Sequence, residues 1–391
     1  MPAVCSAGGA NARSELKLKR APPGRVARPV VRVADVLRAN AAEYLARRGG
    51  RAAAIERRTL AQLTVCRTAA LGGHAWACDT CGEVQVAYNS CRNRHCPTCG
   101  GPARARWLER MREDILPVPY FHLVFTLPHE LSTLVLANRR ALYGLLFHSA
   151  WRALQQLAAD PKHLGARVGA VMVLHTWGQN LEHHPHVHCV VPGGGLSADG
   201  SQWIASSPKF FLPVVALSRL FRGKFLDGLK RLHRAGSLKL EGGLAPLAEA
   251  KGFSQWLAPF YEKDCVVYCQ PPVDPEQGPE AVLKYLACYV AGAAISDARL
   301  LAHNAGQVTF RAKNYRQERK RQTLTLSGVE FTRRFLLHIL PRGLPRIRYY
   351  GLLANTQRGT LLPRCRELLK ATETAPIVPP ATVALCSEPS S

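Results

Sequence analysis

The stretch HHPHVHCVV, residues 183–191, holds four histidines within six positions and then continues as an apolar run. If PHVHCVVP (185–192) is a β-strand, its side chains alternate between two faces. His186 and His188 then share one face, and Val187 points to the other. Two imidazoles on a rigid strand make a good pair of ligands for a divalent metal. The stretch therefore predicts a strand with one apolar face and one metal-binding face, although a lone His-x-His pair often serves neither purpose.

A metal at this pair needs a further protein ligand. Gln179 lies seven residues before His186, just after the apolar run VGAVMVLHTW (168–177). A return loop between antiparallel neighbours would bring it back beside His186, and His175, His183 and Glu182 are the alternatives. Two imidazoles and one amide oxygen form a weak, open site, which suits Mg²⁺ or Mn²⁺ acting on a phosphate. We expect His183 and His184 to lie in the loop without a catalytic role.

Other apolar runs place this strand in a larger fold. FHLVFTLP (121–128) and DCVVYCQ (264–270) read as strands, whereas residues 130–159 and 279–294 read as helices. Strand–helix–strand–strand followed by strand–helix predicts an α+β fold, with a mainly antiparallel sheet and helices on one face. Two amphipathic helices between residues 31 and 66 and a cysteine-rich module precede it. We expect a disordered basic tail at 1–30, a helical and zinc-binding module at 31–116, the sheet domain at 117–355 and a mostly disordered tail at 356–391.

The charge balance indicates the partner. Lys and Arg number 52 against 27 Asp and Glu, a formal net charge of +25. So large a charge is self-repelling unless a polyanion offsets it, and nucleic acid is the commonest one. Aromatic residues interleave with the basic ones near the C-terminus, as in channels for single strands. The candidate contacts are Arg311, Lys313, Arg316, Arg319, Lys320, Arg346 and Arg348.

No signal peptide or membrane-length apolar run is visible, so we expect a cytoplasmic, nucleoid-associated protein. In that reducing compartment, cysteines favour metal binding over disulfides. Cys78-x-x-Cys81 and Cys96-x-x-Cys99 each resemble a metal-binding turn, and four thiolates close a structural zinc site. Four nearby residues could replace a ligand or build a second site: Cys66, His74, Cys91 and His95.

Several longer strings carry a family resemblance. HTWGQNLEHHPHVHCVVPGGGLS (175–197), CRNRHCPTC (91–99), YFHLVFTLPHEL (120–131) and RRFLLHILPRG (333–343) resemble the rolling-circle transposases of the insertion-sequence-91 family. The likeness runs from about residue 31 to 355. It implies an N-terminal zinc-binding segment followed by an HUH nuclease domain, named for histidine, bulky apolar residue, histidine.

The resemblance also implies one or two tyrosine nucleophiles on a helix beyond the histidine strand. Tyr285 and Tyr289 stand at the matching place, four residues apart and so on one helical face. Aromatic pairs at this spacing commonly only pack. The implied activity is nicking and rejoining of single-stranded or extruded DNA at element ends and targets, through a covalent 5′-phosphotyrosine. A plasmid or phage replication initiator with the same chemistry, or a catalytically dead zinc-ribbon DNA-binding protein, are the alternatives.

Overall fold

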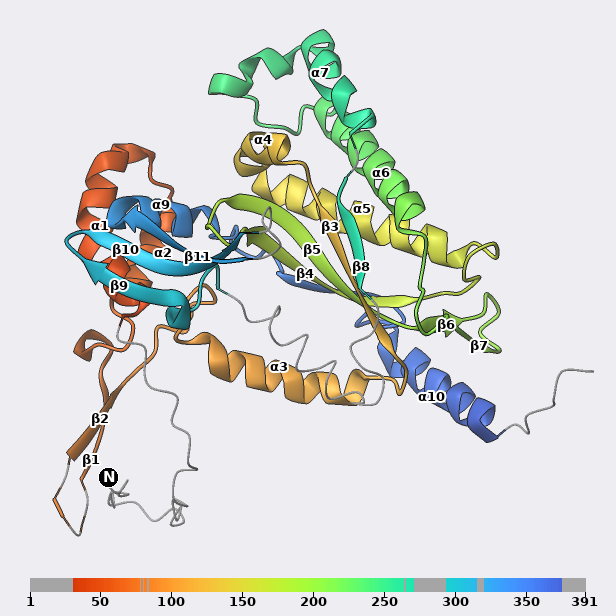
Figure 1. The fold of residues 1–391 in the computed structure, drawn as a ribbon, viewed down its shortest axis with the longest axis horizontal. Coiled ribbons are helices and arrows are strands. Elements are labelled where there is room, and N and C mark those ends of the chain that lie inside the picture. Colours follow the sequence, from red (N-terminus) through yellow and green to blue (C-terminus); the bar gives the residue numbers. More distant parts are fainter. Residues whose placement is uncertain are drawn as a thin grey trace, which may run out of the picture.

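A five-stranded antiparallel sheet forms the centre of the protein. The computed structural model describes residues 31–77, 79, 81–82, 84–263, 265–270, 293–314 and 320–374. The strand order is β12-β4-β5-β3-β8, and every neighbouring pair is antiparallel (Figure 1). The strands are β3 (Tyr120–Thr126), β4 (Gly169–Trp177), β5 (His183–Pro192), β8 (Val267–Gln270) and β12 (Ile347–Gly351). The predicted α+β class with an antiparallel sheet is confirmed.

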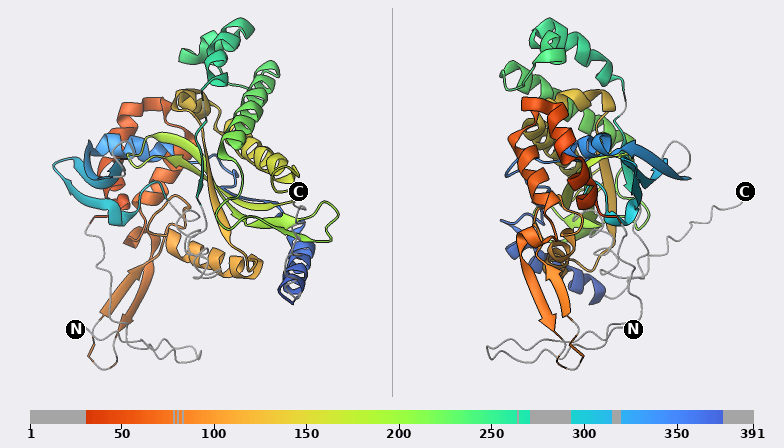
Figure 2. Two further views of the ribbon diagram at one scale, coloured as in Figure 1. Left: turned by 45° about the vertical axis from the view of Figure 1, so that its right-hand side comes forward. Right: turned by 90° about the vertical axis from the view of Figure 1, so that its left-hand side faces the viewer.

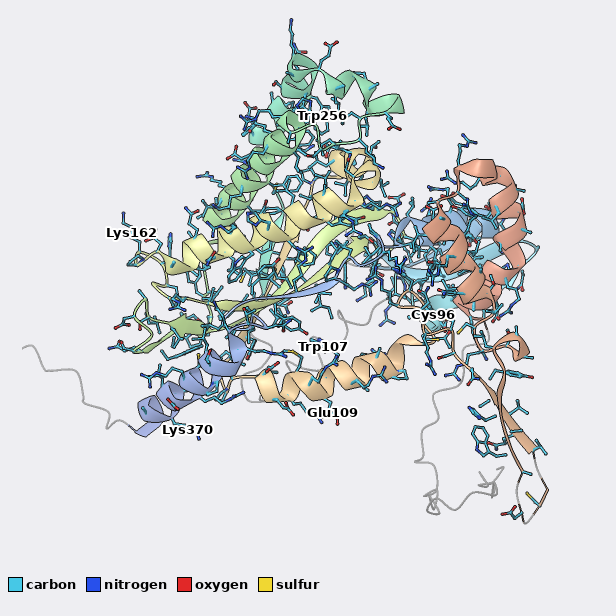
Figure 3. All side chains as sticks on the ribbon, turned by 180° about the vertical axis from the view of Figure 1, so that it is seen from behind. Cys96, Trp107, Glu109, Lys162, Trp256 and Lys370 are labelled. Carbon is cyan, nitrogen blue, oxygen red and sulfur yellow. The ribbon has the colours of Figure 1, made fainter. Side chains whose placement is uncertain are left out.

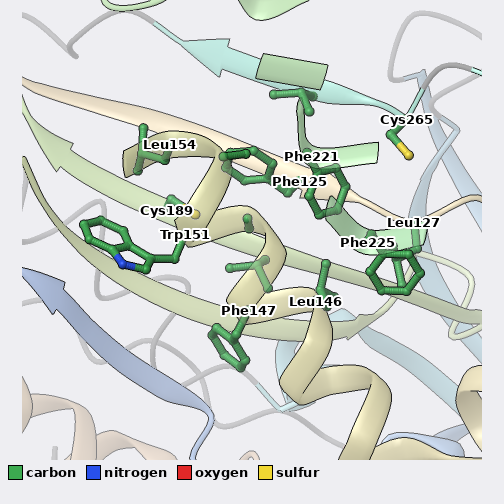
Figure 4. Packing of buried hydrophobic residues seen from close by; sticks show 14 of the residues in the cluster. Phe125, Leu127, Leu146, Phe147, Trp151, Leu154, Cys189, Phe221, Phe225 and Cys265 are labelled. Carbon is green, nitrogen blue, oxygen red and sulfur yellow. The ribbon is translucent and has the colours of Figure 1, made fainter. Parts of the chain in front are cut away.

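One face of the sheet carries the main hydrophobic core. Side-chain alternation directs Phe125 and Val187 toward α5 (Arg139–Ala159) and α6 (Val214–Arg234), where phenylalanines of α6 meet them (Figure 4). Burying each such side chain contributes roughly 1.5–3 kcal/mol. The short helices α4 (Ser132–Ala137) and α7 (Ala250–Leu257) flank this layer, with 3₁₀ turns at η3 (His129–Leu131), η4 (Gly242–Ala248) and η5 (Ala258–Tyr261).

The opposite face of the sheet is also covered by helices, which differs from the predicted one-sided arrangement. Trp107 of α3 (Gly100–Asp114) packs among Val171, Val173 and residues of α10 (Arg358–Thr374). Trp107 Nε1 donates a hydrogen bond of 2.8 Å to the Tyr349 hydroxyl on β12. The reason is that the middle of β4 and β5 is apolar on both faces. Residues 358–374, which we expected to be mostly disordered, supply part of this cover.

A second hydrophobic core joins residues 33–66 to residues 294–339, which lie far apart in the sequence. It contains α1 (Val33–Arg48) and α2 (Ala54–Thr64), packed on a three-stranded sheet and on α9 (Gly328–Leu337) (Figure 1). A Cβ at Gly328 would collide with the Asn40 side chain, so glycine permits the close approach of α9 to α1. The predicted boundary after residue 116 therefore does not separate two packing units. The sheet has the order β11-β10-β9, from β9 (Leu300–Asn304), β10 (Gln307–Asn314) and β11 (Lys320–Ser327).

Two small hairpins complete the described elements. The β1 (Gly73–Ala77) and β2 (Val84–Tyr88) hairpin projects away from the rest of the protein (Figure 2). The second, β6 (Gly194–Leu196) with β7 (Trp203–Ala205), follows β5. Short 3₁₀ turns are η1 (Gly49–Arg51), η2 (Ala69–Leu71) and η7 (Asp297–Arg299). Among the described residues, none of the helices combines the length and apolar character that a membrane crossing needs.

Two candidate metal centres

Three histidines converge on the sheet face that also carries α3. His186 and His188 project from β5, and the register places His175 of β4 directly opposite His186. One ring nitrogen from each lies within 4.8 Å of the others. His175 is 7% exposed and His188 9% exposed. The predicted His186 and His188 pair is therefore joined by His175, one of the alternatives to Gln179.

The His186 ring is oriented by its own strand. Its Nδ1 lies 2.7 Å from the carbonyl oxygen of His184. Because a carbonyl oxygen only accepts, Nδ1 must carry the proton. The Nε2 lone pair is then available, which is the usual arrangement of a metal-ligating histidine.

The His188 ring is held from the neighbouring strand. Its Nδ1 lies 2.8 Å from Nε2 of His122 on β3, and the two rings are nearly parallel, with 7° between their planes. His122 is 6% exposed, and burial lowers its pKa to about 4, while a hydrogen bond with the Gln270 side chain acts in the opposite direction. Sequence reasoning missed His122, although YFHLVFT contains it as the polar residue of an apolar strand.

The third ring, His175, is stacked on a tryptophan of its own strand. Trp177 lies 4.5 Å from it between ring centroids, with 18° between the planes. The guanidinium of Arg346 in turn lies 5.3 Å from the Trp177 ring centre, a cation–π contact. Burial lowers the pKa of Arg346 to about 10.

Burial keeps the histidine rings of this region neutral. It lowers the pKa of His186 to about 4, although the hydrogen bond to His184 raises it slightly. Burial also holds the pKa of His188 well below its usual value, and the nearby rings of His175, His186 and His122 add to the effect. Since a metal ligand must be an unprotonated imidazole, these rings are ready to bind a cation at neutral pH.

The other candidates for the third ligand have different surroundings. Gln179 lies in the turn after β4, where its carbonyl oxygen accepts a hydrogen bond of 2.5 Å from Arg299 Nη2. His183 Nε2 lies 2.9 Å from the Tyr143 hydroxyl, and burial lowers its pKa to about 3. The Glu182 side chain is 64% exposed, 3.7 Å from Arg334. Only His175 of these joins the histidine cluster, and ligation by Gln179 stays a prediction.

Four cysteines form the second centre, and they differ in part from the predicted set. Cys66, Cys91, Cys96 and Cys99 place their sulfur atoms within 4.8 Å of one another. Cys66 Sγ lies 3.3 Å from Cys99 Sγ and 3.6 Å from Cys96 Sγ, and Cys91 Sγ lies 3.7 Å from Cys99 Sγ. Tetrahedral zinc with bonds of about 2.3 Å separates its sulfurs by roughly 3.8 Å. The donor chemistry and the spacing both fit zinc.

Of the predicted pair Cys78 and Cys81, the structure describes only Cys81, which is not part of this cluster. Cys81 is exposed in the turn of the β1–β2 hairpin, and Cys78 lies outside the described residues. The hairpin carries its turn away from the core (Figure 2). Cys66, at the end of α2, and Cys91 take the two places instead. The spacing Cys91-x₄-Cys96-x₂-Cys99 was visible in the sequence, but nothing local linked it to Cys66.

The thiols of the cluster share protons when they stand alone. Hydrogen bonds with its three neighbours raise the pKa of Cys96, whereas hydrogen bonds with its three neighbours lower the pKa of Cys99. The pKa of Cys66 is lowered as well and that of Cys91 raised, so the thiolates of Cys66 and Cys99 are favoured at the expense of Cys91 and Cys96. A bound divalent cation would remove this conflict by stabilising all four as thiolates.

Side chains around the cysteines connect this centre to the rest of the fold. Arg94 donates to the carbonyl oxygens of Leu344 (2.7 Å) and Pro341 (3.0 Å), in the loop after α9. Buried Asp297 accepts from Thr98 Oγ1 at 2.7 Å and from the Val33 amide at 2.9 Å. The cysteine loop is thereby tied to the start of α1 and to the segment leading into β9. Figure 3 labels Cys96 near the place where α1 and α2 meet the start of α3.

The remaining predicted site residues fall into three groups. Tyr285, Tyr289, Arg316 and Arg319 lie outside the described residues. Arg311, Lys313 and Lys320 are exposed on the β10–β11 hairpin. The Arg348 guanidinium lies 4.3 Å from the centre of the Phe147 ring, and its DNA-binding role stays a prediction. The same holds for Arg346, whose guanidinium lies against Trp177.

Comparisons with known proteins place both centres within matched regions. Residues 36–127 match the family model described as "Transposase zinc-binding domain", and residues 169–360 match the one described as "Putative transposase". The four clustered cysteines fall in the first range and the three histidines in the second. A solved structure titled "The structure of TrwC complexed with a 27-mer DNA comprising the recognition hairpin and the cleavage site" aligns with 42% of this chain and 65% of its own, at 16% identity and a TM-score of 0.22.

Two curated relatives span most of the chain. "Putative transposase y4qJ" of Sinorhizobium fredii is 49% identical over 351 residues, covering 90% of this chain and 87% of the relative. "Transposase for insertion sequence element IS801" of Pseudomonas savastanoi pv. phaseolicola is 30% identical over 335 residues, covering 82% and 76%. With a metal-ligand cluster in each matched region and this extent of identity, the chain belongs to the insertion-sequence-91 family of transposases, with an N-terminal transposase zinc-binding domain.

Proposed function

We propose that this transposase nicks and rejoins single-stranded DNA through a tyrosine–DNA intermediate at the three-histidine centre. The observation that carries the proposal is the convergence of three imidazoles on one sheet face. Burial lowers the pKa of His186 and of His188, and perturbed histidines clustered in this way are typical of a functional site.

His175, His186 and His188 would hold a divalent cation. Three imidazoles favour a transition metal more strongly than two imidazoles and an amide would. Of the two ions that the sequence suggested, Mn²⁺ therefore fits this set of ligands better than Mg²⁺ does. When bound, such an ion polarises a phosphate oxygen and neutralises developing charge. The four cysteines would hold Zn²⁺ with no open position, which assigns that ion a structural role.

Tyr285 and Tyr289 are the proposed nucleophiles. A tyrosine Oη would attack the phosphorus, forming an O–P bond as the bond to the 3′ oxygen breaks. The phenol proton leaves to solvent, and the departing 3′ oxygen gains one. The phosphotyrosine retains the energy of the broken phosphodiester, so rejoining needs no nucleotide triphosphate.

The proposed substrate is single-stranded or extruded DNA at element ends and at the target. The net charge of +25 supplies attraction for the phosphate backbone. Arg311 and Lys313 are exposed on one face of β10, and Lys320 is exposed at the start of β11, opposite Asn314. No acidic residue occurs in the described parts of those two strands. We assign the three basic side chains to the backbone of the bound strand.

The test is a covalent adduct. Protein, Mn²⁺ and a labelled single-stranded oligonucleotide bearing an element end are incubated, and a band that resists denaturation but yields to protease is expected. Mass spectrometry of the attached peptide should find Tyr285 or Tyr289. Tyr285→Phe/Tyr289→Phe should form no adduct, and each single variant should retain it. A wild-type protein that binds the oligonucleotide but yields neither nick nor adduct with Mn²⁺ or Mg²⁺ would favour a catalytically dead DNA-binding protein.

A further inference from the structure

A row of polar side chains crosses the sheet from the histidine centre to its edge. His188 on β5, His122 on β3 and Gln270 on β8 lie on the same face of three neighbouring strands. The register pairs His122 directly with Gln270, and Val124 with His188, so His122 and His188 are diagonal neighbours. Diagonal side chains in a sheet lie within reach of one another when they are long.

The hydrogen bonds along this row can run in two directions, and only one of them leaves His188 able to bind a metal. If His122 Nε2 donated to His188 Nδ1, then His188 would carry its own proton on Nε2 and could not ligate. The opposite polarity has His188 Nδ1 donating to His122 Nε2 across the 2.8 Å contact. His122 then carries its proton on Nδ1, and the side-chain hydrogen bond with Gln270 gives that proton an acceptor oxygen.

We propose that His122, backed by Gln270, is a positioning residue that keeps His188 in the tautomer able to bind the catalytic metal. This inference rests on the proposed function, because it assigns His188 to that metal. The three ligands are then oriented by three different devices. His186 uses its own strand's carbonyl, His175 stacks on Trp177, and His188 depends on a side chain two residues along the neighbouring strand.

The surroundings of His122 exclude it as a fourth metal ligand and as a base acting directly on the substrate. Its Nε2 is engaged with His188, and its ring is 6% exposed, parallel to the His188 ring at 5.1 Å between centroids. It is not among the residues whose ligand atoms cluster with His175 and His186. Its influence on a substrate therefore passes through His188.

The first experiment reads the tautomer directly. Nitrogen-15 NMR of the histidine rings in the metal-free protein should show His188 protonated on Nδ1. In His122→Phe, which fills the same space without an acceptor, His188 should shift to a mixture with the Nε2–H form. His122→Gln, whose amide oxygen can replace Nε2 as acceptor, should restore the Nδ1–H form.

The second experiment measures Mn²⁺ affinity by calorimetry or electron paramagnetic resonance. Loss of an outer partner of a metal-ligating histidine usually weakens binding about tenfold to hundredfold, and we expect that loss for His122→Phe. Gln270→Leu, on the edge strand, should give a smaller loss and keeps the test open if His122→Phe folds poorly. His233→Phe is the control, because His233 Nε2 bonds the Leu247 carbonyl far from this row.

A purely structural His122 would lower the melting temperature without changing either the tautomer or the affinity, and that result would overturn the proposal. Neither measurement uses DNA. A protein that never forms a DNA adduct but shows the locked tautomer and the Mn²⁺ loss would refute the nuclease proposal alone.

Discussion

The histidine centre and the cysteine centre were predicted from equally short motifs. The predicted histidine pair lies in the histidine cluster, whereas the cysteine cluster contains two residues outside the first predicted set. His186 and His188 share a face because two residues on one strand must do so. Cys78-x-x-Cys81 looked as persuasive, but the structure gathers Cys66 and Cys91 with the second pair. Local periodicity fixes which side chains of one strand lie together, whereas closing a four-ligand site needs the path of the whole chain.

The largest expected effect tests this difference at the cysteines. Cys96 is 2% exposed and lies within the second hydrophobic core. Cys96→Ser should therefore lose one zinc per chain and unfold the cysteine loop together with α1 and α2. Structural zinc sites of this type contribute roughly 10–16 kcal/mol of apparent binding free energy. Zinc analysis and thermal melting would measure both losses.

Cys81→Ser is the matched control for that variant. Because Cys81 is exposed on the hairpin, this change should leave zinc content and melting temperature nearly unchanged. If Cys81→Ser also lost the metal, the hairpin would belong to a zinc site after all.

The third histidine ligand provides the next largest effect. His175→Ala should reduce nicking by about a thousandfold, or ~4 kcal/mol in the transition state, because it removes one of three converging ligands. Gln179→Ala should change nicking only a few-fold. Rates from single-turnover cleavage with Mn²⁺ would measure the ratio, and equal losses in the two variants would return Gln179 to the ligand set.

The sequence predicted an antiparallel sheet, several of its strands and two of the three clustered histidines, because the alternation of side chains along one strand is a local property. The third histidine required the β4–β5 register, since His175 lies eleven residues before His186 in the chain and opposite it in the sheet. Cover on the second sheet face could be expected only once Val171, Val173 and Val190 were known to face away from α5. The contact between His122 and His188 could not be predicted, because a diagonal contact depends on the register between β3 and β5.

A smaller expected effect is the loss of folding stability at low pH. His338 holds the loop between the histidine strands, with Nε2 donating to Leu181 O at 3.0 Å and Nδ1 lying 3.2 Å from Thr176 Oγ1. Burial lowers its pKa from 6.5 to about 3. The folded ring stays neutral while the unfolded chain takes up a proton. The contribution of this residue to the free energy of unfolding is therefore fully present above about pH 6.5. It decreases as the pH falls toward 3, by at most about 1.4 kcal/mol per pH unit.

Urea unfolding at pH 7.5 and pH 5 would measure this loss. His338→Gln should flatten the acid dependence by about 2 kcal/mol over that range, since glutamine does not titrate. His163→Gln, at an exposed position, is the control and should leave the slope unchanged. A slope unchanged in His338→Gln would mean that other groups dominate.

The smallest effect separates exposed from packed arginines. Arg311→Ala and Lys313→Ala should each weaken single-strand binding across all sequences and reduce the slope of log affinity against log salt by about 1. Arg348→Ala should keep the salt slope and instead lower the melting temperature, because its guanidinium packs on Phe147. Fluorescence anisotropy titrations at several salt concentrations would measure the slopes.

The packing of α1 against α9 has a consequence for synthesis of the protein. Val33–Arg48 leaves the ribosome well before its partner helix, Gly328–Leu337, has been made. Until then the apolar faces of α1 and α2 have nothing to cover them, and such transiently exposed surface invites aggregation. The cysteine loop shares that core, so we expect the zinc-binding unit to mature only after α9 has been translated. We therefore expect nascent chains ending after α7 to need a chaperone and to be cut readily by protease within residues 33–64.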